Sequence, residues 1–219
     1  MIRAFWHGLM AAILLAPFAP AAAGYPERPI RLIVPFVAGG SIDRVARLLA
    51  ERIQARVGQP VIVDNRTGAT GNIGTQAVVA APPDGYTLLM QTSALAITPW
   101  LSRLPFDVER DLVPVTRIAR TPYALVVRTS LPVESFEAFV AYAAAQPMAR
   151  RYPGTEVEGF QLLFAARGTP PDVVDRIHAE FARVLRDPDV AKQLRGMGFV
   201  PVGDDPRPAS PRTTPASAS

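Results

Sequence analysis

Three short apolar segments in the first half of the chain have the composition of buried β-strands, because they are rich in branched or aromatic residues and bounded by Pro or Gly. They cover residues 30–34, 61–63 and 86–90. Between the first two, apolar residues recur every three or four positions, which predicts a helix with Ser41 as N-cap and Gly58 at its end. The second segment leads through a loop rich in Gly, Asn and Thr into another helix that ends near Ala81. Alternating strands and helices predict βαβ units and a parallel sheet.

The second half continues with strands and helices but changes character after Pro147. β-rich stretches at 112–118 and 123–127 precede a helix predicted over about 133–145, with Ser130 or Pro132 near its start. Beyond the change, the pattern predicts a strand at 159–165, helices at 171–186 and 189–195, and a last strand at 198–203. From Asp204 onward Pro, Ser, Ala and Thr dominate without apolar periodicity, which predicts a disordered tail over 204–219.

Residues 1–23 have the order of a secretory signal peptide. Arg3 precedes an apolar stretch over 9–18, and the small residues Ala21, Ala22 and Ala23 follow. The alternative is a membrane anchor, but the apolar core is short for a span of about 20 residues, and prolines interrupt its end. We therefore expect cleavage before Gly24 and export to the periplasm.

Composition and charge exclude several classes of function. The formal charge of +4 comes from arginines scattered among acidic residues, so no basic stripe indicates a nucleic-acid partner. With no Cys and two His, the chain lacks the residues of a thiolate or His-rich metal site, and a serine triad is improbable. Neither a phosphate-binding loop of the G-x-x-x-x-G-K-[ST] type nor a G-x-S-x-G elbow is present. We expect no enzyme activity, no metal and no cofactor.

The ends of the three predicted strands carry groups that suit an anion. Gly39 and Gly40 follow the first strand, a Gly-rich loop follows the second, and Thr92 and Ser93 follow the third. Carboxyl ends of parallel strands meet at one edge of a sheet, where free helix N–H groups and hydroxyls can bind an anion. Such loops also occur where they only turn the chain, so the pattern by itself leaves both interpretations open.

Five segments of the chain resemble the Bug (TctC-like) family, the periplasmic receptors of tripartite tricarboxylate transporters. They read YPERPIRLIVPFVAGGSIDRVARLLAERI, GQPVIVDNRTGATGNIG, APPDGYTLLMQTS, LPFDVERDLVPVTRIA and GTPPDVVDRIHAEFARVLRDPDVAKQLRGMGFVPVG, in family order. The resemblance implies a two-lobed, type II periplasmic-binding-protein-like α/β fold that closes on a small organic acid without catalysis. It also implies membrane subunits of such a transporter as partners, and a monomer. The family's carboxylate-binding positions correspond here to Gly39, Gly40, Ser41, Asp43, Ala69, Thr70, Gly71, Asn72, Thr92 and Ser93.

The chain departs from the family after Gln146. Roughly a hundred residues, about the size of a lobe, are missing before Tyr152. We therefore expect a signal peptide (1–23), a nearly complete first lobe (24–147), a C-terminal segment of a strand and helices that packs on it (148–203), and the tail. The second lobe is then largely deleted, which would impair binding. The alternatives are a first-lobe remnant that acts as a sensor or has no ligand and, more remotely, a phosphate-handling enzyme.

Overall fold

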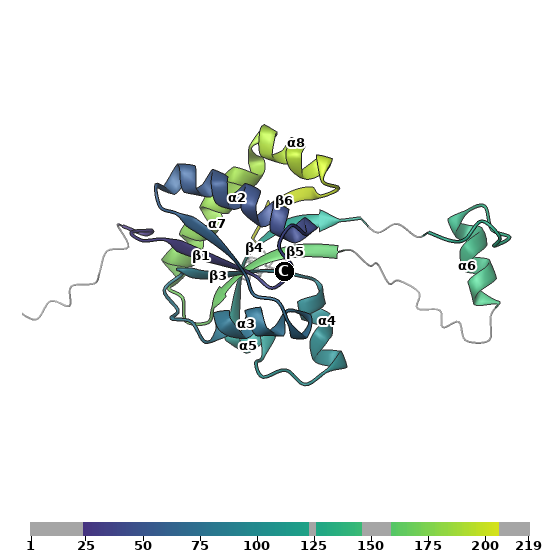
Figure 1. Ribbon diagram of the computed structural model, residues 1–219, viewed down its shortest axis with the longest axis horizontal. Coiled ribbons are helices and arrows are strands. Elements are labelled where there is room, and N and C mark those ends of the chain that lie inside the picture. Colours follow the sequence, from purple (N-terminus) through teal and green to yellow (C-terminus); the bar gives the residue numbers. More distant parts are fainter. Residues whose placement is uncertain (1–23, 123–125, 146–158, 206–219) are drawn as a thin grey trace, which may run out of the picture.

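A six-stranded mixed sheet forms the centre of the protein in the computed structural model, which describes residues 24–122, 126–145 and 159–205 (Figure 1). The strands are β1 (Ile30–Val34), β2 (Val61–Asn65), β3 (Thr87–Thr92), β4 (Leu112–Thr121), β5 (Gly159–Ala166) and β6 (Val200–Asp204). Their order is β2-β1-β3-β5-β4-β6. β1 pairs in parallel with β2 and β3, whereas β5 runs antiparallel to both of its neighbours and β6 antiparallel to β4. The predicted parallel sheet is thus confirmed for the first three strands only.

Helices cover both faces of the sheet. The longer ones are α2 (Ser41–Val57), α7 (Pro171–Arg186) and α8 (Pro188–Gly196), which lie together on one face (Figure 1). The other face carries α3 (Asn72–Val79), α4 (Ala94–Leu101) and α5 (Val108–Asp111). Alternate residues of β3 point to opposite sides, so Leu88 and Met90 join the core under α2 and α7, and Leu89 joins the core under α3. The sequence pattern predicted an α/β fold, and the fold class is confirmed.

Several local predictions need correction. Gly40 is the N-cap of α2 and Ser41 its first residue, because the residue with extended backbone comes one position earlier. The helix expected from about 133 is α6 (Phe136–Ala144), and it begins where the Ser135 hydroxyl accepts a hydrogen bond from the Ala138 N–H at 3.1 Å. Residues 123–125 of the second β-rich stretch lie outside the described residues, and Val126 and Val127 belong to no strand. β4 instead continues to Thr121.

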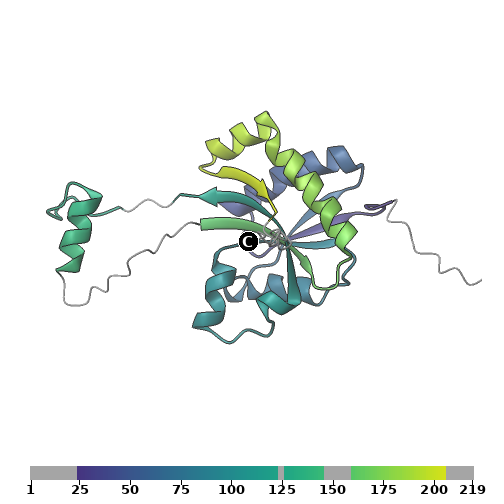
Figure 2. The same ribbon diagram turned by 180° about the vertical axis from the view of Figure 1, so that it is seen from behind.

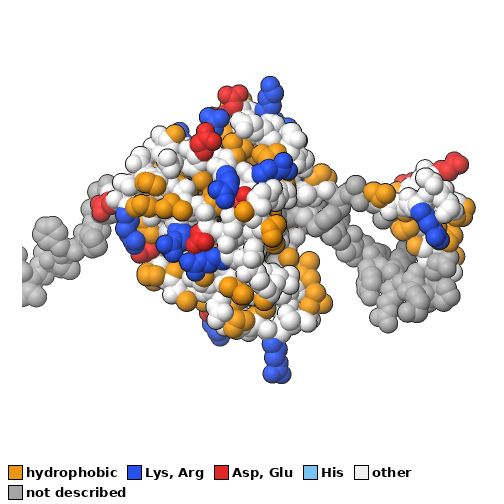
Figure 3. Space-filling model, viewed as in Figure 1, with side chains coloured by type: hydrophobic (Ala, Val, Ile, Leu, Met, Phe, Trp, Pro, Cys, Tyr) orange, Lys and Arg blue, Asp and Glu red, His pale blue; other side chains and the backbone are white. Residues whose placement is uncertain are grey.

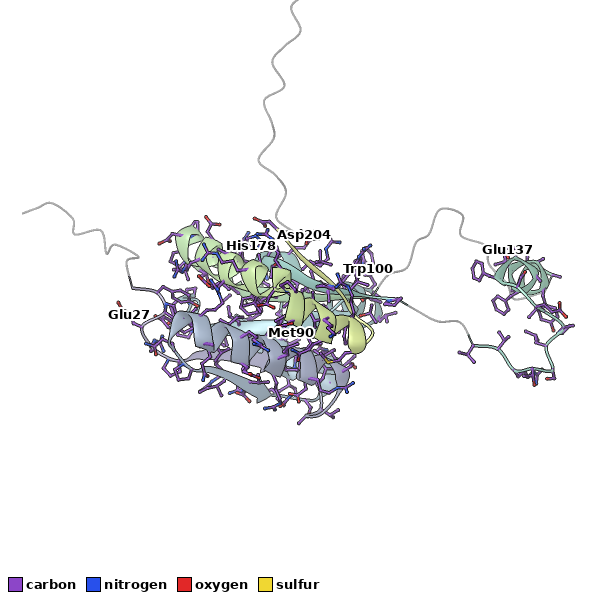
Figure 4. All side chains as sticks on the ribbon, turned by 90° about the horizontal axis from the view of Figure 1, so that it is seen from above. Glu27, Met90, Trp100, Glu137, His178 and Asp204 are labelled. Atoms are coloured by element: carbon purple, nitrogen blue, oxygen red, sulfur yellow. The ribbon has the colours of Figure 1, made fainter. Side chains whose placement is uncertain are left out.

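The chain leaves the sheet at Thr121 and returns at Gly159, and these two residues are partners in the β4–β5 ladder. Of the stretch between them, the structure describes 126–145, and α6 in it lies apart from the sheet in both ribbon views (Figures 1 and 2). Seen from above, Glu137 on α6 is likewise far from Met90 in the sheet and from His178 on α7 (Figure 4). The C-terminal segment supplies β5 to the middle of the sheet. The division at 147/148 remains a prediction.

The two predicted terminal segments fall mainly outside the described residues. The whole of the expected signal peptide, 1–23, lies outside the described residues, and so does the expected tail from residue 206 onward. The first residue of the expected tail, Asp204, is the last residue of β6. Its backbone carbonyl accepts a hydrogen bond from the Thr116 hydroxyl at 2.8 Å, and its carboxylate pairs with Arg117. Among the helices that the structure describes, none is long and apolar enough to cross a membrane.

Candidate functional site

The loop between β1 and α2 is held in a tight conformation by the first turn of the helix. Gly39 has a φ of +79°, a backbone region that favours glycine, and its N–H donates to Asp43 Oδ2 at 2.8 Å. Gly40 precedes the helix, and no side chain caps the N-terminus. The first N–H groups of a helix have no partner within the helix, so the start of α2 can bind an anion.

Asp43 lies beneath this loop and is 1% exposed. Besides the Gly39 N–H, its carboxylate accepts hydrogen bonds from Arg47 Nε and from Asn65 Nδ2, each at 2.9 Å. Asn65 Nδ2 also donates to the carbonyl of Phe36 at 3.1 Å, so the end of β2 and the β1–α2 loop are joined through one carboxylate. Burial by itself raises the pKa of Asp43, but the hydrogen bonds from Arg47, Gly39 and Asn65 outweigh it, and the pKa lies below its ordinary value.

The loop after β2 is a left-handed turn. Gly68, Ala69, Thr70 and Gly71 all have positive φ, between +46° and +120°, and the Gly71 N–H donates to the Gly68 carbonyl at 2.9 Å. Two of these residues are not glycine, and backbone strain of this kind persists only where the surroundings impose it. At Gly71 a Cβ would lie 2.9 Å from Gln91 Nε2, so the loop packs directly against β3.

The end of β3 contacts both this loop and the neighbouring strand β5. Gln91 is 2% exposed; its Oε1 accepts from the Thr92 N–H at 2.9 Å and its Nε2 donates to Thr75 Oγ1 at 3.4 Å. Thr92 Oγ1 accepts from the Ala94 N–H at 3.2 Å, which leaves the proton of its hydroxyl free to be donated. The Ser93 N–H donates to the carbonyl of Phe160 on β5 at 3.0 Å.

A depression of about 310 Å³ lies where α2 begins, β3 ends, and the chain leaves and re-enters the sheet. Its lining consists of Ser41, Ile42, Thr92, Ser93, Ala94, Ile97, Thr121, Gly159, Phe160, Gln161 and Phe199. None of the described residues that line it is charged, and α2 begins here with the positive end of its dipole. The volume suits a small organic molecule. A larger hollow of about 810 Å³ lies between α4 and α5, but no predicted site residue lines it.

The structure gathers part of the predicted set around this depression. Ser41, Thr92 and Ser93 line it, and Gly39 and Gly40 form the loop immediately before Ser41. Asp43 is covered by protein groups, and the turn formed by Ala69, Thr70, Gly71 and Asn72 does not line the depression, although Gln91 ties it to the same strand end. Among the described residues, no group of three or more His, Cys, Asp or Glu could hold a metal ion.

Sequence reasoning missed two buried glutamines at this site, Gln91 and Gln161. Each is 2% exposed and stands at the end of an apolar run, which is 88–90 before Gln91 and 162–166 after Gln161. A polar residue within a buried strand usually has a specific partner, and this was the signal available in the sequence. On the face of the molecule drawn in Figure 3, basic and acidic side chains are interspersed.

Fold and site together define a protein of the periplasmic-binding-protein class, and the comparisons with known proteins give its family. Residues 45–157, more than half of the chain, match the family described as tripartite tricarboxylate transporter family receptor, TctC. The chain belongs to this family. Because its members are receptors, the expectation that the chain is not an enzyme is confirmed.

Relatives agree with this assignment. Protein BugT of Bordetella pertussis is 39% identical over 190 residues, which cover 78% of this chain and 58% of BugT. The structure of Rpa4515 from R. palustris with adipate is 25% identical, with a TM-score of 0.69 over 83% of this chain and 91% of that one. The periplasmic binding protein BugD, at 22% identity, shares the fold with a TM-score of 0.67 over 83% of this chain and 90% of that one. The chain thus spans little more than half the length of BugT.

Proposed function

We propose that the chain captures a small carboxylated organic acid in the periplasm for the membrane subunits of a tripartite tricarboxylate-type transporter. One observation carries the proposal. In a member of this receptor family, the uncapped start of α2 and the hydroxyls of Thr92 and Ser93 line a depression, and none of its described lining residues is acidic. These groups are donors, which a carboxylate requires. The adipate of Rpa4515 is an acid of this class.

The residues carried over from the family take different parts in this proposal. The backbone at Gly40 and Ser41, with the Thr92 and Ser93 side chains, contacts the carboxylate. Asp43 holds Gly39 in place and does not touch the acid, because its oxygens already accept three hydrogen bonds from the protein. The turn formed by Ala69, Thr70, Gly71 and Asn72 offers further backbone N–H groups beside the same strand end. No cofactor or metal takes part.

Binding should be weak in this chain, because the segment between β4 and β5 is too short to form a second lobe. A two-lobed receptor gains affinity by closing on its ligand and excluding water. Here only residues 122–158 stand between β4 and β5, and this range is shorter than the roughly 50 residues of a small domain. Two or three hydrogen bonds contribute about 2–4 kcal/mol, which corresponds to millimolar affinity or weaker. The same observation favours a second candidate, a first-lobe remnant that binds as a sensor or has no ligand.

A titration with succinate followed by amide NMR tests the proposal. Succinate at up to about 50 mM should shift the amide signals of Ser41, Thr92 and Ser93 in a saturable way. The double variant Thr92→Val and Ser93→Ala should lose this saturation, whereas Ser102→Ala, an exposed serine at the end of α4, should keep it. Absence of saturable shifts in the unaltered chain would refute carboxylate binding and leave the remnant without a ligand.

A further inference from the structure

The side chain of Gln161 has an unsatisfied oxygen at the candidate site. Gln161 is 2% exposed, and its Oε1 is buried without a hydrogen-bond partner among the described residues. It stands opposite Thr92 in the β3–β5 ladder and lines the same depression as Thr92 and Ser41. Buried polar atoms are nearly always paired in native proteins, so an unpaired one within a site needs an explanation.

The fold gives no reason for a glutamine here. Leu163 and Ala165, which lie on the same side of β5 as Gln161, belong to the apolar core under α2 and α7. An apolar side chain at position 161 would continue that core and would leave no acceptor unpaired. Residues that break the local pattern without stabilising the fold concentrate at functional sites.

The chemistry of the unpaired atom defines what it can bind. An amide oxygen and a carboxylate are both hydrogen-bond acceptors only. Gln161 Oε1 therefore cannot bind the carboxylate that contacts the start of α2 and the hydroxyls of Thr92 and Ser93. It requires a donor from another part of the ligand. An ammonium group would need an acidic partner once it is buried, and none of the lining residues is acidic. A hydroxyl group needs no such partner.

We propose that Gln161 is a specificity-determining residue, which selects acids that carry a hydroxyl group next to the carboxylate. The proposal rests on the carboxylate-binding function described above and names the class of acid. A site that must pair a buried acceptor discriminates against ligands without the donor, because those ligands leave the acceptor unpaired.

Three four-carbon acids test this on the native chain, because they differ at one position only. Succinate has no substituent, malate has a hydroxyl group and aspartate an ammonium group. In amide NMR titrations, malate should bind at least about tenfold more tightly than succinate, and aspartate no more tightly than succinate.

Substitution of Gln161 separates a role in selectivity from one in folding. Gln161→Leu should reduce the affinity ratio of malate to succinate to about one and leave the affinity for succinate within about twofold. Its Tm should stay the same or rise by a few degrees, because an unpaired acceptor is removed; a structural role would lower it. Gln161→Met serves the same purpose if the leucine variant does not fold. Gln193→Leu on the exposed surface of α8 is the matched control and should keep the native ratio.

Each contrary result has a distinct meaning. Equal saturable binding of succinate and malate overturns the role of Gln161 and leaves carboxylate binding intact. A preference for malate that persists in Gln161→Leu also overturns it, as does tighter binding of aspartate. If none of the three acids gives saturable shifts, both this inference and the proposed function fail.

Discussion

Asp43 offers the clearest test of how the site is held together. Replacing it with Ala removes the acceptor of three hydrogen bonds. The Gly39 N–H and Arg47 Nε lose this partner, and Asn65 Nδ2 keeps only its bond to the Phe36 carbonyl. Bonds to a charged group contribute about 1.5–3 kcal/mol each, but Arg47 is 54% exposed and can turn to water. We therefore expect a loss of about 2–4 kcal/mol in the free energy of unfolding, and a fall in Tm of roughly 6–12 °C.

Thermal and urea unfolding followed by circular dichroism measure this loss, with Asp64→Ala as the matched control. Asp64 also accepts a hydrogen bond from an arginine, Arg66, at 3.0 Å, but both partners are partly exposed, so its removal should cost less than about 0.5 kcal/mol. Equal effects of the two substitutions would refute the role of Asp43.

The pKa of Asp43 adds a dependence on pH. Because its pKa is lowered on folding, the ionised carboxylate stabilises the fold above its unfolded pKa of about 3.9. This contribution is lost as pH falls below 4 and through the folded pKa. The difference in stability between the native chain and Asp43→Ala should thus be full at pH 7 and should shrink below pH 4. A difference that is constant down to pH 2 would contradict this explanation.

Three further predictions concern the loop, the C-terminus and export. Gly71→Ala should lower the free energy of unfolding in urea by about 1–3 kcal/mol, because φ of Gly71 is +91° and an added Cβ would meet Gln91. Gly39→Ala has open space around it and should lower this free energy by only about 1 kcal/mol; equal losses would exclude the close packing at Gly71. A chain that ends after residue 205 should keep its Tm. One that ends before Asp204 should melt several degrees lower, because it loses the ion pair of Asp204 with Arg117 and the hydrogen bond from Thr116 to the Asp204 carbonyl; a lower Tm for the longer chain would contradict this. N-terminal sequencing of periplasmic protein should begin at residue 24, and an intact N-terminus in the membrane fraction would oppose it.

The periodicity of apolar residues was sufficient to predict the helices and strands that bury one clear face. α2 and α7 repeat apolar residues every three or four positions, and every residue of β1 except Arg31 is apolar and buried. The place of β5 could not be predicted, because nothing in a short apolar strand specifies that it inserts between β3 and β4 in the antiparallel direction. α4 was missed as well, since it is short and contains Pro99.

The candidate site was predictable where it depends on strand ends and not where it depends on side-chain packing. Thr92 and Ser93 follow a recognisable strand, so their position beside the depression could be inferred from the sequence. Asp43 was expected to bind the ligand, but its oxygens are occupied by Gly39, Arg47 and Asn65, and such contacts between distant segments are not visible in a single sequence.

The affinity of the purified chain for a dicarboxylate tests the central claim most directly. This claim is that Ser41, Thr92 and Ser93 bind a carboxylate although the chain is too short for a second lobe to close on it. Calorimetry on the purified protein with succinate, malate and adipate should give dissociation constants in the millimolar range or weaker. A micromolar dissociation constant that Gly40→Val abolishes would contradict the account, because it would show that the rim is enclosed.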